Sequence, residues 1–160
     1  MKAIYLATCV WLAGCFACVP VQPETNRPAQ VLNKASAWAA TYANRTDWQA
    51  FLACYRQDLH FEDELLNKVT HSLDSFAAFY NWPDTSFQKM HTGQQMLVIT
   101  EWAVNDSLAV GRGYFDTFKW QGQVMQGPWP VTFWLWFDHD LQISRQVDVI
   151  DYPRWLLCAQ

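Results

Sequence analysis

The stretch WPVTFWLWFDHDLQISRQVDVIDY, residues 129–152, decides the fold. Aromatic and β-branched residues fill positions 129–137, the residues DHD follow at 138–140, and a second apolar run occupies 142–152. This pattern predicts two antiparallel strands joined by a short turn. Both alternating faces of residues 129–137 are apolar, so we expect helices on one face of the sheet. A second subunit, a lipid or a protein partner should cover the other face.

The neighbouring segments extend this hairpin into a domain with helices first and strands after. Asn105-Asp106 is typical of a hairpin turn, and Gln121-Gly122 offers another. Hydrophobic residues recur at helical spacing in the first half of the chain, and TDWQ at 46–49 matches a capping box with Thr46 as N-cap. The order predicts an α+β domain, with three N-terminal helices packed in a curved antiparallel sheet built around a four-stranded meander. The predicted helices cover 31–44, 48–55 and 72–80, and the predicted strands cover 59–62, 96–104, 107–118, 124–137 and 142–152.

Length and charge narrow the class of protein. The chain has 160 residues, enough for one domain with a real core, and only 16% of them are charged. The formal net charge is −4 and Lys and Arg are not clustered, so a nucleic-acid partner is not expected.

The first residues predict a targeting segment. Lys2 precedes an apolar run that ends in Leu12-Ala13-Gly14-Cys15, which resembles the lipobox of bacterial lipoproteins. The resemblance implies a signal peptide at 1–14, a lipidated Cys15, and a Pro-rich tether at 15–30 that leads into the domain at 31–160. Since Phe16 is not the Asp that retains such proteins at the inner membrane, the expected location is the bacterial cell envelope, at the outer membrane facing the periplasm. Ordinary cleavage after Ala17, giving a secreted protein, is the alternative.

Cysteine and histidine patterns leave little room for a metal or redox centre. Cys54 and Cys158 form either a disulfide or two buried free thiols, and their spacing does not distinguish the two. The four histidines show no metal-binding motif, and no nucleotide-binding or nucleophile-elbow motif is present. We therefore expect neither a metal nor a cofactor.

The order of four segments carries a family resemblance. TDWQAFLACYRQDLHFEDEL at 46–65, AVGRGYF at 109–115, WLWFDHDLQI at 134–143 and VDVIDYP at 147–153 together resemble the SnoaL-like branch of the nuclear transport factor 2 (NTF2) superfamily over residues 31–155. The resemblance implies a cone-shaped α+β barrel, in which a curved sheet wraps around helices and leaves a deep pocket. Many members are dimers, and the superfamily holds both enzymes and binding proteins, so the fold does not fix the function.

Enzymes of this superfamily suggest three site patterns. The ketosteroid isomerase pattern Y-x-x-D-x-x-x-E-D matches from Tyr55 to Asp63 and makes Asp63 the candidate base. The positions of that family's hydrogen-bond donors are Ala39 and Phe133, which cannot donate, so a steroid isomerase is disfavoured. Tyr42, one turn after Ala39, is a substitute donor to which we give little weight.

The other two patterns point to the last strand. The limonene-epoxide hydrolase pattern assigns a pocket acid to Asp148 and a pocket Arg to Arg112, with Tyr114 at the place of that family's second acid. The polyketide-cyclase pattern also assigns acid–base work to Asp148. Asp148 and Asp151 are separated by an odd number of residues, so in a strand they face opposite ways, and the family register places Asp148 inside. Asp151 is then expected to be solvated.

These patterns give a set of candidate site residues, and for two of them a purely structural role is the alternative. The catalytic candidates are Asp63, Asp148 and Arg112, and the candidates that line the pocket are Trp38, Tyr42, Tyr55, Tyr114 and Trp134. Asp148 could instead be a structural acid bonded to Arg112 or Tyr114, and Arg112 could form an ion pair with Asp116 or Glu101.

Two functions remain open from the sequence. The first is a membrane-anchored pocket protein that binds a small apolar molecule or a partner, as a homodimer formed through the sheet. The missing donors and the expected anchor favour it slightly. The alternative is a small acid–base enzyme, like an epoxide hydrolase, isomerase or cyclase, that uses Asp63 and Asp148.

Overall fold

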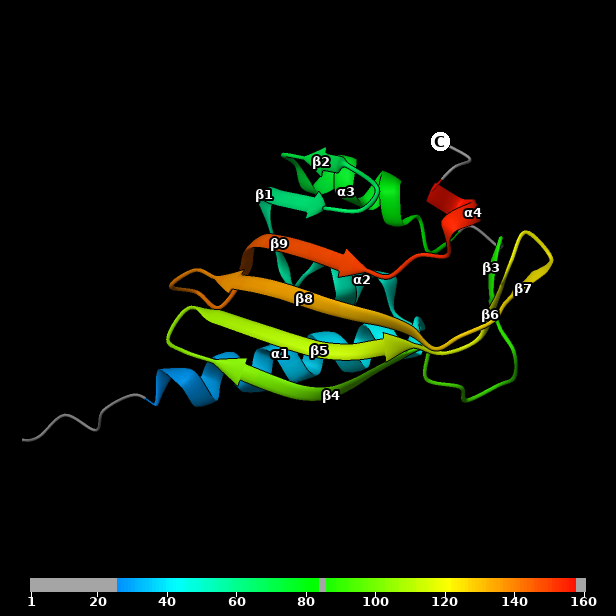
Figure 1. Cartoon of the computed structure of the whole chain (residues 1–160). Coiled ribbons are helices and arrows are strands. Elements are labelled where there is room, and N and C mark those ends of the chain that lie inside the picture. The colour runs from blue at the N-terminus through cyan, green and yellow to red at the C-terminus, as the bar shows by residue number, and fades with distance from the viewer. Residues whose placement is uncertain (1–25, 84–85, 158–160) are drawn as a thin grey trace, which may run out of the picture.

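A computed structural model describes residues 26–83 and 86–157 of the chain, and Figure 1 shows a curved sheet packed against helices. Cys15, the expected signal peptide and Cys158 lie outside the described residues. The four helices among these residues are α1 (Arg27–Asn44), α2 (Trp48–Leu52), α3 (Leu73–Tyr80) and α4 (Arg154–Leu157). The nine strands of the described part are β1 (Tyr55–Asp63), β2 (Lys68–Thr70), β3 (Phe87–Lys89), β4 (Leu97–Val104), β5 (Leu108–Phe115), β6 (Phe118–Trp120), β7 (Gln123–Met125), β8 (Trp129–Phe137) and β9 (Ile143–Ile150).

Helix α1 begins earlier than the sequence pattern predicted. Asn26 is its N-cap and Pro28 lies in the first turn, where a missing N–H costs nothing, so residues 27–30 are helical and not part of a tether. The predicted hydrophobic stripe is confirmed. It is formed by Val31, Ala35, Trp38, Ala39, Tyr42 and Ala43, all buried. The helix ends at Arg45, which is in the left-handed conformation with φ of 49°.

The start of α1 is tied to the far hairpins of the sheet. The Arg27 guanidinium donates from Nε to the carbonyl of Asp106 at 3.1 Å and from Nη1 to the carbonyl of His139 at 3.1 Å. Its Nη2 donates to the carbonyl of Asp138. One side chain therefore joins the β4–β5 turn and the β8–β9 turn to the root of the helix.

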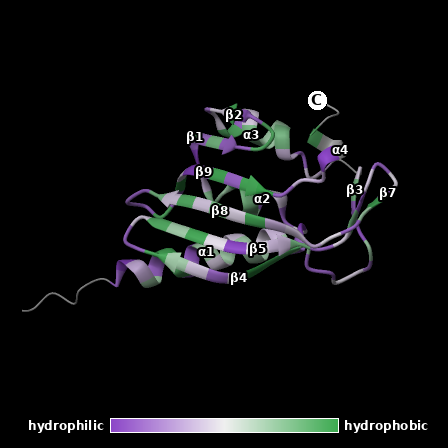
Figure 2. Cartoon of the chain, viewed as in Figure 1, coloured by the Kyte–Doolittle hydropathy of each residue, from purple (hydrophilic) through white to green (hydrophobic). Residues whose placement is uncertain are grey.

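The sheet corrects the predicted strand order. Six strands run in the order β2-β1-β9-β8-β5-β4, and hydrophobic residues recur along the central strands in Figure 2. The expected antiparallel meander is present, but β1 pairs with β9 in parallel, so the sheet is mixed. The predicted strand at 59–62 is only the middle of β1, because α2 ends at Leu52 and Tyr55 already belongs to β1. The predicted N-cap of α2 was one residue early, since the Asp47 side chain accepts from the Ala50 N–H.

Three short strands form a second sheet beside the first. They run in the order β3-β6-β7 and lie at the end of the molecule away from the β8–β9 turn (Figure 1). The predicted strands at 107–118 and 124–137 are each broken here, into β5 and β6 and into β7 and β8. The Gln121-Gly122 turn is confirmed and joins β6 to β7, with both residues at positive φ.

The inner face of the sheet and the helices enclose one core. Trp38, Phe51, Phe61, Phe76 and Phe133 are fully buried in it. Cys54 lies at the edge of the core, with its Sγ 3.4 Å from the Ala50 carbonyl oxygen. Because Cys158 is not among the described residues, the disulfide stays a prediction. No helix of the described part is long and apolar enough to cross a membrane.

Candidate functional site

Two aspartates lie side by side at the inner face of the sheet. Asp63, the last residue of β1, is the register partner of Asp148 on the neighbouring parallel strand β9. Each side chain is 1% exposed. Adjacent strands are about 4.8 Å apart, so the two carboxyl groups share one site. The predictions that Asp148 faces inward and that Asp151 is exposed are both confirmed.

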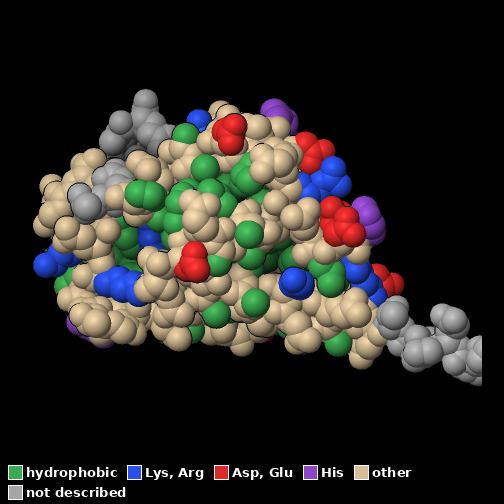
Figure 3. Space-filling view, turned by 180° about the vertical axis from the view of Figure 1, so that it is seen from behind, with side chains coloured by type: hydrophobic (Ala, Val, Ile, Leu, Met, Phe, Trp, Pro, Cys, Tyr) green, Lys and Arg blue, Asp and Glu red, His purple; other side chains and the backbone are tan. Residues whose placement is uncertain are grey.

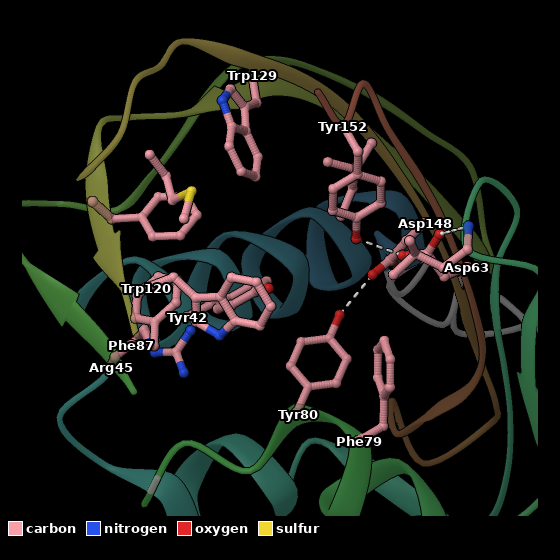
Figure 4. Close-up of a pocket in the computed structure, with 14 residues that line it drawn as sticks. Tyr42, Arg45, Asp63, Phe79, Tyr80, Phe87, Trp120, Trp129, Asp148 and Tyr152 are labelled. Carbon is pink, nitrogen blue, oxygen red and sulfur yellow. Dashed lines mark hydrogen bonds between the residues drawn. The ribbon is translucent and has the colours of Figure 1, made fainter. Parts of the chain in front are cut away.

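The aspartates form one wall of a cavity of about 340 Å³ (Figure 4). A cavity of this size is at the lower end of the range for small-molecule sites. Its lining is mainly aromatic and comes from the helices, from the end of the main sheet and from the three short strands. The lining residues are Tyr42, Arg45, Asp63, Leu66, Phe79, Tyr80, Phe87, Phe118, Trp120, Met125, Trp129, Asp148, Ile150 and Tyr152.

A one-way chain of hydrogen bonds ends at Asp148. The Trp38 indole N–H donates to the Tyr55 hydroxyl at 2.6 Å, and this hydroxyl donates to Gln146 Oε1 at 2.7 Å. An indole N–H can only donate, so it fixes the direction of the hydroxyl and the orientation of the amide. Gln146 Nε2 then donates to Asp148 Oδ1 at 2.7 Å and to the Tyr80 hydroxyl at 3.1 Å, which donates to Asp148 Oδ2 at 2.6 Å.

The surroundings of Asp148 also set its protonation state. Both carboxyl oxygens already accept a hydrogen bond, one from the Tyr80 hydroxyl and one from Gln146 Nε2. Burial raises the pKa of Asp148 to about 8, the hydrogen bonds from Tyr80 and Gln146 oppose this rise, and the nearby Asp63 adds to it. Asp148 is thus mainly protonated at neutral pH.

Asp63 has an environment that suits the anion better. Tyr152 donates to its Oδ2 at 2.6 Å and the Leu66 backbone N–H donates to its Oδ1 at 3.0 Å. Burial raises the pKa of Asp63, while these hydrogen bonds oppose the rise. Burial also raises the pKa of Tyr80 and of Tyr152, so both hydroxyls remain hydrogen-bond donors at neutral pH.

Arg112 does not belong to this site. It lies on the outer face of β5, its side chain is 74% exposed, and its guanidinium lies 3.4 Å from Glu101, the alternative considered from the sequence. The prediction that it is a pocket residue is wrong because β5 alternates and directs Ala109 and Phe115 inward. Asp148 accordingly has neither Arg112 nor Tyr114 as its partner.

Of the five residues predicted to line the pocket, only Tyr42 does so. Trp38 and Tyr55 are buried in the core behind the pocket, where they start the hydrogen-bond chain. Tyr114 and Trp134 lie on the outer face of the sheet. These two predictions are wrong for the same reason as Arg112, since even-numbered residues of β5 and β8 face away from the helices.

Sequence reasoning missed three polar residues of the site. Tyr80 and Tyr152 donate to the two aspartates, and Arg45 lies against Phe87 on the wall opposite the aspartates in Figure 4. Each comes from the end of a helix or strand, where spacing patterns carry no information about direction. Ala39 and Phe133, at the donor positions of the ketosteroid isomerase pattern, cannot donate a hydrogen bond. Other elements therefore supply the donors of this site.

A metal site is not evident among the described residues. Asp138, His139 and Asp140 bring ligand atoms within 4.8 Å of one another at the β8–β9 turn. The Asp138 carboxylate is already used there, because it accepts from the backbone N–H groups of Asp140 and Gln142 and from Arg56. This cluster is explained as a turn and not as a cation site.

Solved structures share this fold. A SnoaL-like polyketide cyclase from Shewanella putrefaciens is 19% identical with a TM-score of 0.65, covering 82% of this chain and 98% of that one. An NTF2-like protein from Anabaena variabilis is 15% identical with a TM-score of 0.63, covering 84% and 96%. A protein with a ketosteroid isomerase-like fold from Catenulispora acidiphila, in complex with trimethylamine, is 14% identical with a TM-score of 0.55, covering 72% and 82%. No family model and no curated protein matches the sequence. The chain thus has the SnoaL-like, NTF2-like fold that the sequence predicted.

Proposed function

We propose that the protein is an acid–base enzyme that moves a proton on a small, largely apolar molecule, with Asp63 as the base and Asp148 as the acid. The sequence slightly favoured a binding protein, and we now place the enzyme ahead of it. The observation that carries the proposal is the pair of buried carboxyl groups side by side in an aromatic cavity. In many enzymes the acid and the base are two carboxyl groups whose surroundings keep one protonated and the other ionised.

The two aspartates divide the chemical roles by their surroundings. Asp63 accepts from a backbone N–H and a tyrosine hydroxyl, which favour its ionised form, so it can take a proton from carbon or water. Burial keeps Asp148 protonated, and because Asp148 lines the cavity it can donate this proton to a developing oxyanion. Trp120 and Trp129 on the far side help to exclude water from the reacting groups.

The experiment uses nitrobenzisoxazole, a small neutral aromatic probe that reports on buried carboxylate bases. A base takes the proton on its ring carbon, the N–O bond breaks, and a coloured cyanonitrophenolate forms. We expect the purified protein to accelerate this step over free acetate, and Asp63→Asn to lose about a hundredfold or more. Asp148→Asn should lose less, because it removes only stabilisation of the leaving oxygen. Asp151→Asn is the matched control on an exposed acid and should react as the wild type does.

Two results would end this proposal: a wild-type rate no higher than that of acetate, or full activity in Asp63→Asn. The binding function would then be favoured, provided that an apolar probe still binds when both aspartates are replaced. A small-molecule site in this fold has a precedent in the trimethylamine complex of the Catenulispora acidiphila protein.

We also propose that the protein is anchored in the bacterial envelope through Cys15. The support is the Leu12-Ala13-Gly14-Cys15 sequence after an apolar run. Cys15→Ser should abolish incorporation of labelled palmitate and move the protein from the membrane fraction to the soluble fraction. Unchanged labelling would contradict the anchor.

A homodimer through the outer face of the sheet is the third part of the proposal. Trp134 is 38% exposed and stacks on Trp136 with ring centroids 6.1 Å apart, while Arg145 lies over Trp136 at 4.6 Å. The helices of the described part pack on the other side of the sheet and do not cover this aromatic face (Figure 1).

A further inference from the structure

Within the described part of the chain, a cation lies at the pocket wall with no carboxylate paired to it. The Arg45 guanidinium carbon is 3.8 Å from the centre of the Phe87 ring and 5.1 Å from that of Trp82. Cation–π contacts of this kind hold a guanidinium in place without neutralising it. Across residues 26–83 and 86–157 we find no carboxylate paired with Arg45.

A second basic group and a buried donor adjoin the same guanidinium. Arg45 and Phe87 also line a second cavity next to the pocket, together with Lys89 and Trp82. Burial and the nearby Arg45 charge lower the pKa of Lys89. The Trp82 Nε1 is buried and has no acceptor in the described part of the chain. Three donors thus lie around a cavity that no carboxylate of the described residues lines.

The aspartates do not serve as the missing acceptor. Both carboxyl groups are on the opposite wall in Figure 4 and are bonded to Tyr80, Gln146, Tyr152 and the Leu66 backbone. The charges that act on Asp148 come from Asp63 and not from Arg45. The pocket therefore has an acid wall and a separate cationic wall. In the view from behind, hydrophobic side chains gather around basic ones at this end of the molecule (Figure 3).

We propose that the substrate is a small aromatic carboxylate, held with its carboxylate on Arg45 beside Lys89 and its ring among Phe79, Phe118 and Trp120. A guanidinium binds a carboxylate through two parallel hydrogen bonds, which orients a flat molecule as well as attracting it. A ring held in this way reaches from the cationic wall toward Asp63 and Asp148. The orientation toward the aspartates rests on the proposed acid–base function, whereas the preference for an anion does not.

The test compares two probes of nearly equal shape, naphthoate and naphthamide, by calorimetry on the folded domain. We expect wild type to bind naphthoate about ten- to a hundredfold more tightly, the range for a hydrogen bond to a charged group. Arg45→Gln should remove this preference and keep the affinity for naphthamide. Arg45→Lys, which keeps the charge but not the paired donors, should retain part of it. Arg145→Gln is the matched control, because it also removes an arginine that lies over an aromatic ring.

The outcomes separate this inference from the proposed function. Equal affinity for the two probes in wild type, no binding of either, or an undiminished preference in Arg45→Gln would overturn the anion site. Nitrobenzisoxazole is neutral and does not need Arg45, so its ring opening tests the aspartates alone. An anion preference without ring opening would leave a carboxylate-binding pocket and reject the enzyme.

Discussion

Trp38 shows how a buried aromatic residue can control a site that it does not touch. Its indole N–H starts the chain that passes through Tyr55 and Gln146 and sets both hydrogen bonds to Asp148. The sequence suggested Trp38 and Tyr55 as pocket walls because large rings near a polar site often contact ligands. Their role is instead to orient Gln146, and no spacing pattern reports on that.

The raised pKa of Asp148 makes the stability of the fold depend on pH. An unfolded Asp titrates near 4, whereas Asp148 in the folded protein has a pKa of about 8. Between these values the folded state holds one proton more than the unfolded state, so the free energy of unfolding falls as the pH rises. One proton gives a slope of about 1.4 kcal/mol per pH unit.

Urea unfolding of the wild type and of Asp148→Asn should reveal this slope as a difference. From about pH 4 to about pH 8 the wild type should lose stability relative to the variant, and above that range the difference should level off. Asp63, whose pKa is also raised, remains in both proteins and largely cancels. A difference that is independent of pH would mean that Asp148 is ionised throughout.

The sequence could predict which acids meet but not which residues assist them. Asp63 and Asp148 followed from the motif order and from strand alternation. Arg112 was misplaced because the family match overrode the same alternation, which puts Gly111 and Gly113 inside and Arg112 outside. Tyr152 lies two residues past the end of β9, where the strand period no longer applies.

The parallel pairing of β1 with β9 is the element that builds the site. It places the last residue of β1 beside the sixth residue of β9, although 85 positions separate them in the chain. Sequence patterns predicted the antiparallel hairpins because their turns are local. They missed the parallel pair and the three short strands, since both depend on contacts between distant segments.

Gly113 permits the bend of β4 over β5. The pairing of these strands shifts between Ile99 and Glu101, and a Cβ on Gly113 would lie 1.9 Å from the Val98 carbonyl oxygen.

Gly113→Ala should destabilise the domain by about 3 kcal/mol or more, because the clash is with backbone and no side chain can move aside. Gly122→Ala is the control. It has a positive φ of 79° but no atoms within 4 Å, so it should cost only about 1 kcal/mol. Urea unfolding measures both, and equal losses would show that the close approach at Gly113 relaxes freely.

The proposed dimer can be tested on the intact domain. If two copies meet through the outer face, Trp134→Glu should shift the protein from dimer to monomer in sedimentation experiments, because it places a charge in an apolar contact. Val124→Glu, on an exposed hydrophobic residue of β7 away from this face, should leave the dimer intact. A wild type that stays monomeric at all concentrations would refute the interface.

The Arg27 contacts fix the start of α1 to the hairpin turns, so the helix acts as a spacer between its N-terminus and the pocket. With 18 residues, this helix extends roughly 27 Å from Arg27 to Arg45 on the wall of the pocket. If Cys15 is lipidated, the cationic wall lies at the end of the helix that is farther along the chain from the anchor. Tension on the anchor would then load the two hairpin turns through Arg27 and leave the proposed acid–base pair undisturbed.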